Sequence, residues 1–276
     1  MRSAMNRRDF VLALSAPLAL AQVGAGAQSA APARLKGRIR QGVTRGVFGR
    51  VTACDLIGPQ DWPTLKKYGL VPSMYPPGPG GTIPDALNRR ENHAKLEASL
   101  RAAIDECAAN KVPNIITFSG NRRGMSDAEG ADNCVEFLNK VKAHAEDKGV
   151  TISLEILNSK VNHRDYMFDH MAWGVDVVRR VNSPRVRILY DIYHAQIMDG
   201  DIVRTIRDNI ALISHFHTGG NPGRNDIDET QELNYRYVMQ EISALGFTGF
   251  VTHEYTPKPG SDPIAVLRKA IEICDV

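Results

Sequence analysis

The sequence lacks three features: a hydrophobic run long enough to cross a membrane, a Cys-x-x-Cys pair, and a large net charge. Without the cysteine pair, the common zinc and thiol-redox motifs are excluded, and we expect the four cysteines to be buried thiols. The formal charge is only +3, from 34 basic and 31 acidic residues. A balance so close to neutral is not typical of a nucleic-acid-binding protein.

The first residues have the pattern of an export signal. The pair Arg7 and Arg8 precedes a 13-residue apolar stretch, Val11–Val23, and small residues follow at 25–27. An uncleaved membrane anchor is the alternative, but the stretch is shorter than the about 20 residues that a span needs. We therefore predict a twin-arginine signal peptide at residues 1–27, cleaved near Ala27, and a periplasmic protein that does not associate with the membrane afterwards.

The chain after residue 27 has the organisation of one α/β domain. Residues 28–36 are rich in Ala, Ser and Pro and are predicted to be a disordered linker. Strand-like and helix-like segments then alternate over residues 37–276, which is typical of a parallel sheet with helices outside. Strands are predicted at 38–44, 52–57, 71–75, 114–118, 151–157, 186–191, 212–217 and 249–254, and helices at 61–68, 88–110, 127–148, 165–181, 196–209, 234–245 and 262–274. The pattern predicts a (β/α)8 TIM barrel.

The first unit of this barrel is too short. Only about eight residues separate the strand at 38–44 from the strand at 52–57, whereas a crossover between parallel neighbours takes about a dozen or more. We therefore predict a truncated first βα unit in which helix 1 is missing. We expect apolar surface to be uncovered there. We expect the functional site to survive, because the four strands that carry its residues lie in the second half of the chain.

Ionisable residues stand at the ends of four strands in the second half of the chain. Glu155, Asp191, His217 and Glu254 each follow an apolar, β-branched run, and His215 shares a strand face with His217. Because the carboxyl ends of parallel strands meet at one edge, these side chains should converge there. Carboxylate and imidazole groups are ligands for a divalent cation.

Each of these residues also has a structural interpretation. The glutamates could form buried salt bridges, although neither of their strands carries an inward basic neighbour. Asp191 could be a helix N-cap, and single histidines are more often core residues than ligands. Arg224 ends a Gly- and Pro-rich loop that could carry it over the barrel mouth to bind a carboxylate, but it could equally be a solvated loop arginine.

Five short motifs point to a known family. They are Glu155-Ile-Leu-Asn158, Tyr190-Asp-Ile-Tyr-His194, Asn221-Pro-Gly-Arg224, Glu232-Leu-Asn-Tyr235 and His253-Glu-Tyr255. These motifs resemble the hydroxypyruvate isomerase family of the xylose isomerase-like TIM barrels, a group that also holds the ketose 3-epimerases. The sequence departs from the family at position 217, where His stands as in the epimerases and where hydroxypyruvate isomerases commonly have Gln.

The resemblance implies a role for each residue of the cluster. Glu155 and Glu254 would be the catalytic acid and base, and they would also bind Mg²⁺ or Mn²⁺ together with Asp191 and His217. His194 and Arg224 would contact the substrate.

These roles lead to an expected activity. The protein would convert a small α-hydroxycarbonyl acid through an enediolate, as between hydroxypyruvate and tartronate semialdehyde. The alternatives are a ketose 3-epimerase, a non-catalytic periplasmic sugar-binding protein and a metal-dependent endonuclease. The endonuclease would need more histidines and a basic face, so no nucleic-acid partner is expected. The sequence leaves a homo-oligomer open.

Overall fold

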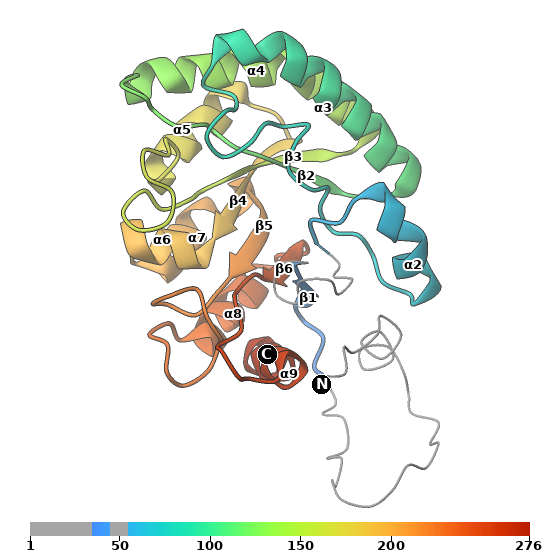
Figure 1. Ribbon diagram of the computed structural model, residues 1–276, viewed down its shortest axis with the longest axis vertical. Coiled ribbons are helices and arrows are strands. Elements are labelled where there is room, and N and C mark those ends of the chain that lie inside the picture. The colour runs from blue at the N-terminus through green and yellow to red at the C-terminus, as the bar shows by residue number, and fades with distance from the viewer. Residues whose placement is uncertain (1–34, 45–54) are drawn as a thin grey trace, which may run out of the picture.

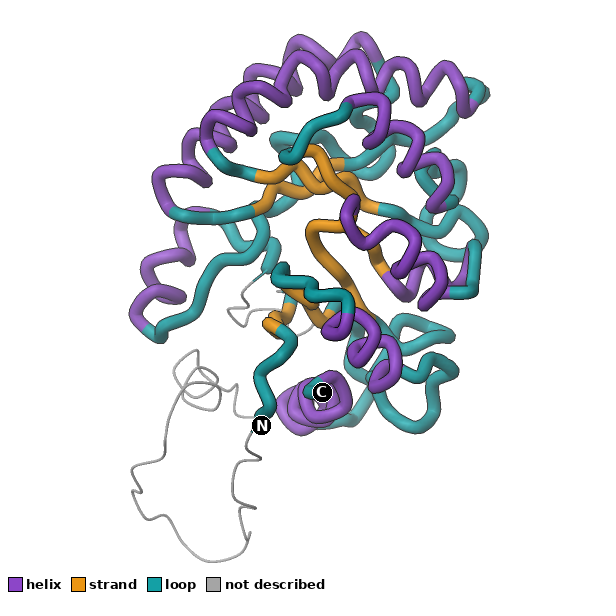
Figure 2. Tube along the Cα trace, turned by 180° about the vertical axis from the view of Figure 1, so that it is seen from behind, coloured by secondary structure: helices purple, strands orange, loops and turns teal. Residues whose placement is uncertain are grey.

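The structure is a computed structural model that describes residues 35–44 and 55–276 of the 276-residue chain. Its six strands are all parallel and form one sheet in the order β1-β6-β5-β4-β3-β2. The strands are β1 (Arg40–Val43), β2 (Asn114–Thr117), β3 (Thr151–Glu155), β4 (Val186–Asp191), β5 (Ile213–Thr218) and β6 (Phe250–His253). The sheet curls, with the helices around its outer side (Figures 1 and 2). This confirms the predicted α/β barrel architecture.

The helices follow the strands in the expected order. They are α2 (Trp62–Lys67), α3 (Arg90–Asn110), α4 (Asp127–Lys148), α5 (Met171–Val181), α6 (Ile192–Met198), α7 (Ile202–Asn209), α8 (Tyr235–Ala244) and α9 (Pro263–Cys274), with 3₁₀ turns η2 (Pro59–Asp61) and η3 (Ile210–Leu212). Helix α4 begins where the sequence indicates it, because Ser126 caps the amide of Glu129 in a Ser-x-x-Glu arrangement.

Within residues 35–44 and 55–276, the ring of strands is incomplete on one side. Asp55 pairs with Thr44 and Tyr75 pairs with Ile115, each as a single parallel bridge and not as a regular strand. The predicted strands at 52–57 and 71–75 are therefore wrong for the residues described. Prolines before and after Tyr75 cannot donate to a ladder, which limits pairing there.

Asp55 and Ser73 meet across this gap. The Ser73 hydroxyl donates to Asp55 Oδ1 at 3.0 Å, so a side-chain contact joins the two sides of the ring. Only residues 45–54 lie between Thr44 and its neighbour Asp55, which agrees with a shortened first unit. The predicted absence of helix 1 concerns residues 45–54, which lie outside the described residues.

Two predicted helices have different bounds. The helix predicted at 165–181 begins only at Met171, because residues 166–169 are buried in a loop whose carbonyls accept from Arg122. The helix predicted at 196–209 is two helices, α6 and α7. They are separated at Gly200 and Asp201, whose φ angles of 64° and 42° interrupt the helical hydrogen bonding.

The core lies between the sheet and the helices. Leu96, Leu100, Ile104 and Cys107 of α3 are all buried, as their spacing predicts. Cys107, Cys134 and Cys274 are buried free thiols, and Cys54 lies outside the described residues. Within residues 35–44 and 55–276, no helix is long and apolar enough to cross a membrane. The predicted signal peptide, residues 1–27, lies outside this part of the chain.

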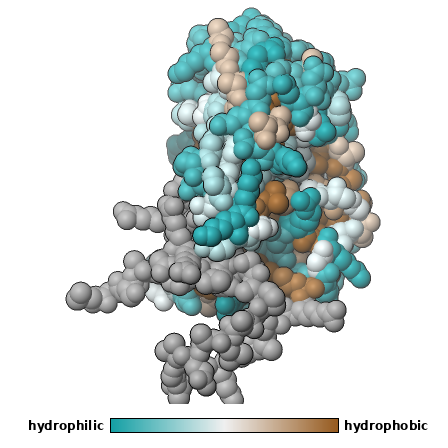
Figure 3. Space-filling view, turned by 90° about the vertical axis from the view of Figure 1, so that its right-hand side faces the viewer, coloured by the Kyte–Doolittle hydropathy of each residue, from teal (hydrophilic) through white to brown (hydrophobic). Residues whose placement is uncertain are grey.

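One face of the molecule carries hydrophobic side chains at its surface. Figure 3 shows hydrophilic residues over the upper part of this face and hydrophobic residues in its lower right part. Val71, which follows α2, is 44% exposed. The expected uncovering of apolar surface near the shortened unit stays a prediction, because that unit includes residues 45–54.

Candidate active site

The carboxyl ends of four neighbouring strands bring the predicted residues together. Glu155 and Asp191 end β3 and β4, His217 is the last residue but one of β5, and Glu254 follows β6. One donor atom from each of these four residues lies within 4.8 Å of the others. The register explains this convergence, because Asp191 of β4 pairs directly with His217 of β5.

His217 lies at the centre of the cluster and is fully buried. Its Nδ1 lies 2.7 Å from Glu254 Oε2 and 3.1 Å from Glu155 Oε1. Burial opposes a positive charge here, but the charge of Glu254 and the contacts with Asp55 and Glu155 raise the pKa of His217 well above its usual value.

The two glutamates have opposite electrostatic environments. Burial raises the pKa of Glu155 to about 7, against the lowering effect of His217. Burial would also raise the pKa of Glu254, but the charges of Arg224 and His217 hold it below its usual range. The basic partners that their own strands do not supply therefore come from β5 and from the loop after it.

Asp191 is both a helix N-cap and a member of the cluster, the two roles that the sequence left open. Its Oδ1 accepts from the amide of His194 at 3.1 Å and caps α6. Its Oδ2 faces the cluster and lies 2.6 Å from Arg224 Nη2. One carboxylate thus fixes the start of the helix that carries His194 and still presents an oxygen to the site.

The loop after β5 places Arg224 inside the site. The guanidinium donates to Asp191 and Glu254 at 2.6 Å each, and only 18% of the side chain is exposed, so a solvated loop arginine is excluded. Arg224 has a φ of 53°, a left-handed conformation that is uncommon outside glycine. Gly220 lies too close to the carbonyl of Asp226 for a Cβ, which explains the glycine in this turn.

Arg224 also contacts His194, the other predicted substrate residue. Arg224 Nη1 lies 2.6 Å from His194 Nε2, and the guanidinium lies over the ring of Tyr193. Burial, aided by the charge of Arg224, lowers the pKa of His194 well below its usual value. An uncharged imidazole and a permanent cation thus stand side by side at the cluster.

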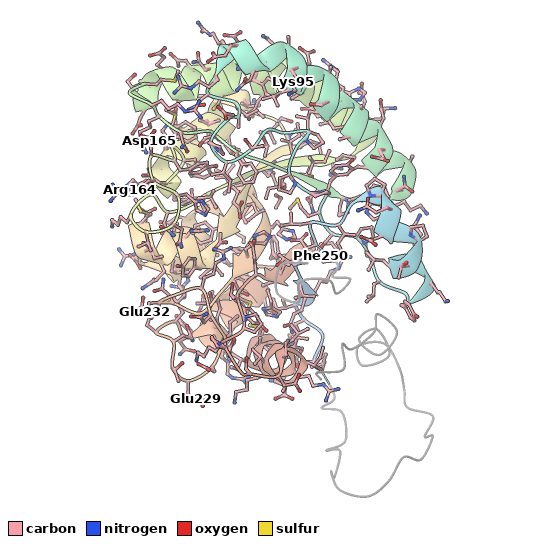
Figure 4. All side chains as sticks on the ribbon, viewed as in Figure 1. Lys95, Arg164, Asp165, Glu229, Glu232 and Phe250 are labelled. Atoms are coloured by element: carbon pink, nitrogen blue, oxygen red, sulfur yellow. The ribbon has the colours of Figure 1, made fainter. Side chains whose placement is uncertain are left out.

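The loop after β3 adds residues that the sequence reasoning missed. Asn158 contacts His194 Nδ1 through its side-chain amide at 2.6 Å, and the ring of His163 packs edge-on to His194 at 5.2 Å. Asn158 stands in the first of the five motifs, but nothing in the pattern singled out His163. Figure 4 labels Arg164 and Asp165 on this loop and Glu229 and Glu232 on the loop after β5, and both loops lie on the same side of the molecule.

Asp55 is a further residue that the sequence analysis did not place in the site. Its carboxylate is fully buried, and Oδ2 lies 2.9 Å from His217 Nε2 and 3.3 Å from His215 Nε2. Burial opposes ionisation, but the two histidines lower the pKa of Asp55 below its usual range. The four strand-end residues all come from the second half of the chain, as expected, but a residue beside the shortened unit also contacts the cluster.

The cluster fits a divalent cation. Three carboxylates and one imidazole converge in a buried space, and this mainly oxygen donor set suits Mg²⁺ or Mn²⁺. Arg224 supplies positive charge to Asp191 and Glu254, and a divalent cation would supply it to all three carboxylates. Glu155, Asp191, His217 and Glu254 are the residues that would hold the ion.

A separate cavity lies at the opposite end of the barrel. It has a volume of about 590 Å³ and is lined by the first residues of several strands, among them Arg40, Asn114, Thr151 and Phe250. None of the clustered acids lines it. Chemistry in parallel α/β barrels takes place at the carboxyl ends of the strands, so this cavity is not the candidate active site.

Comparison with known proteins identifies the family. Residues 64–275 match the family described as "Xylose isomerase-like TIM barrel". The chain belongs to this family. Among the xylose isomerase-like TIM barrels, the 2-oxo-tetronate isomerase of Pectobacterium atrosepticum is 25% identical over 224 residues, 75% of this chain and 82% of that protein. The putative hydroxypyruvate isomerase of Homo sapiens is 31% identical over 105 residues, only 38% of each chain.

Solved structures agree with the family assignment. A structure entitled AP endonuclease, family 2, from Brucella melitensis has a TM-score of 0.69 and 27% identity, covering 76% of this chain and 83% of that one. A D-psicose 3-epimerase from Clostridium cellulolyticum H10 has a TM-score of 0.62 at 19% identity, covering 78% and 81%. The second likeness shows only that this member of the xylose isomerase-like family shares the epimerase fold.

Proposed function

We propose that the protein is an isomerase of a small α-hydroxycarbonyl acid, of the type that interconverts hydroxypyruvate and tartronate semialdehyde. The observation that carries the proposal is the convergence of donor atoms from Glu155, Asp191, His217 and Glu254 within 4.8 Å. Relatives named 2-oxo-tetronate isomerase and hydroxypyruvate isomerase support an enzyme of the isomerase class. The Mg²⁺ or Mn²⁺ requirement and the exact substrate are part of the proposal.

In this proposal the two glutamates move the protons. One removes a proton from the carbon that bears the hydroxyl group, which leaves an enediolate. The hydroxyl proton passes to the former carbonyl oxygen, and a carboxylate returns a proton to the neighbouring carbon. Because the reaction runs in both directions, Glu155 and Glu254 exchange roles between the forward and the reverse reaction. When bound, a divalent cation supplies Lewis acidity that stabilises the negative charge developing on the substrate oxygens.

Arg224 and His194 position the substrate in this proposal. The guanidinium offers forked donors to a carboxylate group, and a substrate carboxylate would replace one of its contacts with Asp191 or Glu254. His194, held by Asn158, lies beside Arg224 and can contact a substrate oxygen.

The alternatives differ in what they require. Return of the proton to the opposite face of the same carbon would make the protein a ketose 3-epimerase, and His at position 217 favours this second candidate. A decayed enzyme would keep the pocket as a sugar-binding protein. An endonuclease would need a basic face, which a net charge of +3 does not indicate.

A substrate screen tests the proposal. The purified protein, stripped of metal and reloaded with Mg²⁺ or Mn²⁺, is assayed with hydroxypyruvate, tartronate semialdehyde and small ketoses in deuterated water. Conversion of hydroxypyruvate with deuterium at the carbon that receives the proton is expected. Conversion of ketoses alone would establish the epimerase. Absence of both turnover and deuterium exchange would contradict an enzyme.

We also propose that the protein is exported by the twin-arginine route. Arg7, Arg8 and the apolar stretch after them support this proposal. Arg7→Lys/Arg8→Lys should leave the protein in the cytoplasm with residues 1–27 attached, whereas the parent chain should appear in the periplasm with a new amino terminus after Ala27. Equal distribution of the two forms would contradict the route.

A further inference from the structure

Asp55 holds two histidines with one oxygen atom. Asp55 Oδ2 lies 2.9 Å from Nε2 of His217 and 3.3 Å from Nε2 of His215, and none of the three side chains is exposed. Its other oxygen accepts from the Ser73 hydroxyl at 3.0 Å. The Asp55 amide donates to the carbonyl of Val43 on β1, which fixes the backbone that carries the carboxylate.

This contact determines which nitrogen of His217 faces the acids. A carboxylate can only accept, so the nitrogen beside Asp55 carries a hydrogen. The other nitrogen, Nδ1, then points to Glu155 and Glu254 at 3.1 Å and 2.7 Å. A flip of the ring would put the carbons Cδ2 and Cε1 where the two nitrogens lie, so the acids would lose Nδ1 and the buried Asp55 carboxylate would lose its closest donor.

We propose that Asp55 is the positioning residue that makes His217 a metal ligand through Nδ1. Asp55 itself stays outside the ligand set, and it orients the imidazole as carboxylates behind ligating histidines do elsewhere. His215 shares the same oxygen and also lies 3.1 Å from the Thr252 hydroxyl, so it keeps the carboxylate in place. This inference rests on the proposed function, because it presumes a cation held by His217 and the three acids Glu155, Asp191 and Glu254.

The same three residues could instead hold an ion of their own. Asp55, His215 and His217 each offer one donor atom within 4.8 Å of the others. The hydrogen-bond distances and the second partner of His215 Nε2 favour the positioning role. An ion between these residues would bind Nε2 of His217, so the two arrangements differ in the nitrogen that is used.

Metal affinity is the first test. Kd for Mn²⁺ is measured by calorimetry on the full chain and on three variants. Asp55→Ala should bind about 10- to 100-fold more weakly, the usual effect of losing a carboxylate behind a ligating histidine. Asp55→Asn, which keeps an accepting oxygen, should restore part of the affinity. Ser73→Ala is the matched control: it removes the contact across the gap but leaves both histidines bonded to Asp55, so its Kd should change much less than that of Asp55→Ala.

Magnetic resonance of the parent protein is the second test, and it holds even if Asp55→Ala fails to fold. The protein is labelled with ¹⁵N-histidine and loaded with ¹¹³Cd²⁺. Coupling of the metal to Nδ1 of His217, with a hydrogen on Nε2, is expected. Coupling to Nε2, or equal Mn²⁺ affinity in Asp55→Ala, would overturn the positioning role. Equal losses of Mn²⁺ affinity in Ser73→Ala and Asp55→Ala would show that Asp55 acts only by stabilising the fold. Failure of the parent protein to bind either metal would instead overturn the metal site of the proposed function.

Discussion

Arg224 and Asp191 are joined by a contact of 2.6 Å between Nη2 and Oδ2, although 33 residues separate them in the sequence. The same Nη2 lies 2.6 Å from Glu254 Oε2, so one guanidinium bridges the ends of two strands. A charge-assisted contact of this kind is short and strong. It ties the position of the loop after β5 to the charge of the cluster.

Arg224→Ala should raise KM for a carboxylate substrate by about 10- to 100-fold, because a hydrogen bond to a charged group contributes about 1.5–3 kcal/mol. The loss should be much smaller for a neutral ketose. Steady-state kinetics on both substrate types check this. Arg164→Ala, which removes an exposed arginine from the loop after β3, is the control and should change neither value. An equal rise in KM for both substrate types would show that Arg224 has a structural role.

Glu155→Gln and Glu254→Gln should each abolish turnover while the protein still folds. Each change removes a proton-transfer group and one negative charge from the cluster, but it keeps the shape of the side chain. Activity and circular dichroism are measured together, and Glu229→Gln, at an exposed position, is the control. If either variant kept a kcat near that of the parent, the substituted glutamate would not be the catalytic acid or base.

Removal of the cation should lower the melting temperature. A ligand that binds only the folded state at 100 times its Kd stabilises that state by about 2.7 kcal/mol. Differential scanning calorimetry before and after EDTA, and after return of Mn²⁺, checks this. Glu155→Gln lacks one of the negative charges that would hold the ion, so its melting temperature should change less when the ion is removed and returned. An identical melting curve in all three conditions of the parent protein would contradict a bound ion.

The three described thiols should be unreactive in the folded protein. Burial raises the pKa of Cys107 and of Cys274 to about 12 each, and it also raises the pKa of Cys134, so none forms a thiolate at neutral pH. In a Cys54→Ser variant, a disulfide reagent at pH 8 should detect no thiol until denaturant is added, and three afterwards. Raised pKa values also mean that stability is lost as the pH rises from about 9 to about 12. Rapid reaction of these thiols with the reagent before denaturant is added would contradict their burial.

Backbone amides of β1 should exchange faster than those of β3 and β4. Among the described residues, strand β1 has a full partner only in β6, and its other side pairs with Asp55 at a single bridge. Strand β3, in contrast, has β2 and β4 on its two sides. Hydrogen exchange followed by mass spectrometry checks this. Uniform protection of the three strands would mean that the gap in the ring does not weaken its edge.

Local sequence patterns predicted the residues that lie at strand ends. Glu155, Asp191 and Glu254 follow runs whose alternation fixes both the strand and the direction of its side chains, so their convergence could be expected. The start of α5 could not be predicted in this way. Apolar residues Tyr166, Met167 and Phe168 continue the helical pattern, but they are buried in a loop through contacts with distant segments.

Asp55 escaped prediction for a related reason. It and its partner His217 stand 162 residues apart, and their contact depends on how the ring closes, which no local pattern encodes. Its segment, 52–57, looked like an ordinary strand on the far side of the shortened connection. Only the assembled structure brings its carboxylate against the imidazole.

The side-chain contact between Ser73 and Asp55 joins the gap in the ring to His217, which Asp55 also contacts. Asp55 is therefore shared by two equilibria, closing of the ring and loading of the cation. Coupling between two equilibria is reciprocal, so whatever free energy the closed ring adds to ion binding, the bound ion returns to the closed ring. An ion bound at the ends of β3 to β6 would thus stabilise the contact across the gap, on the opposite side of the barrel.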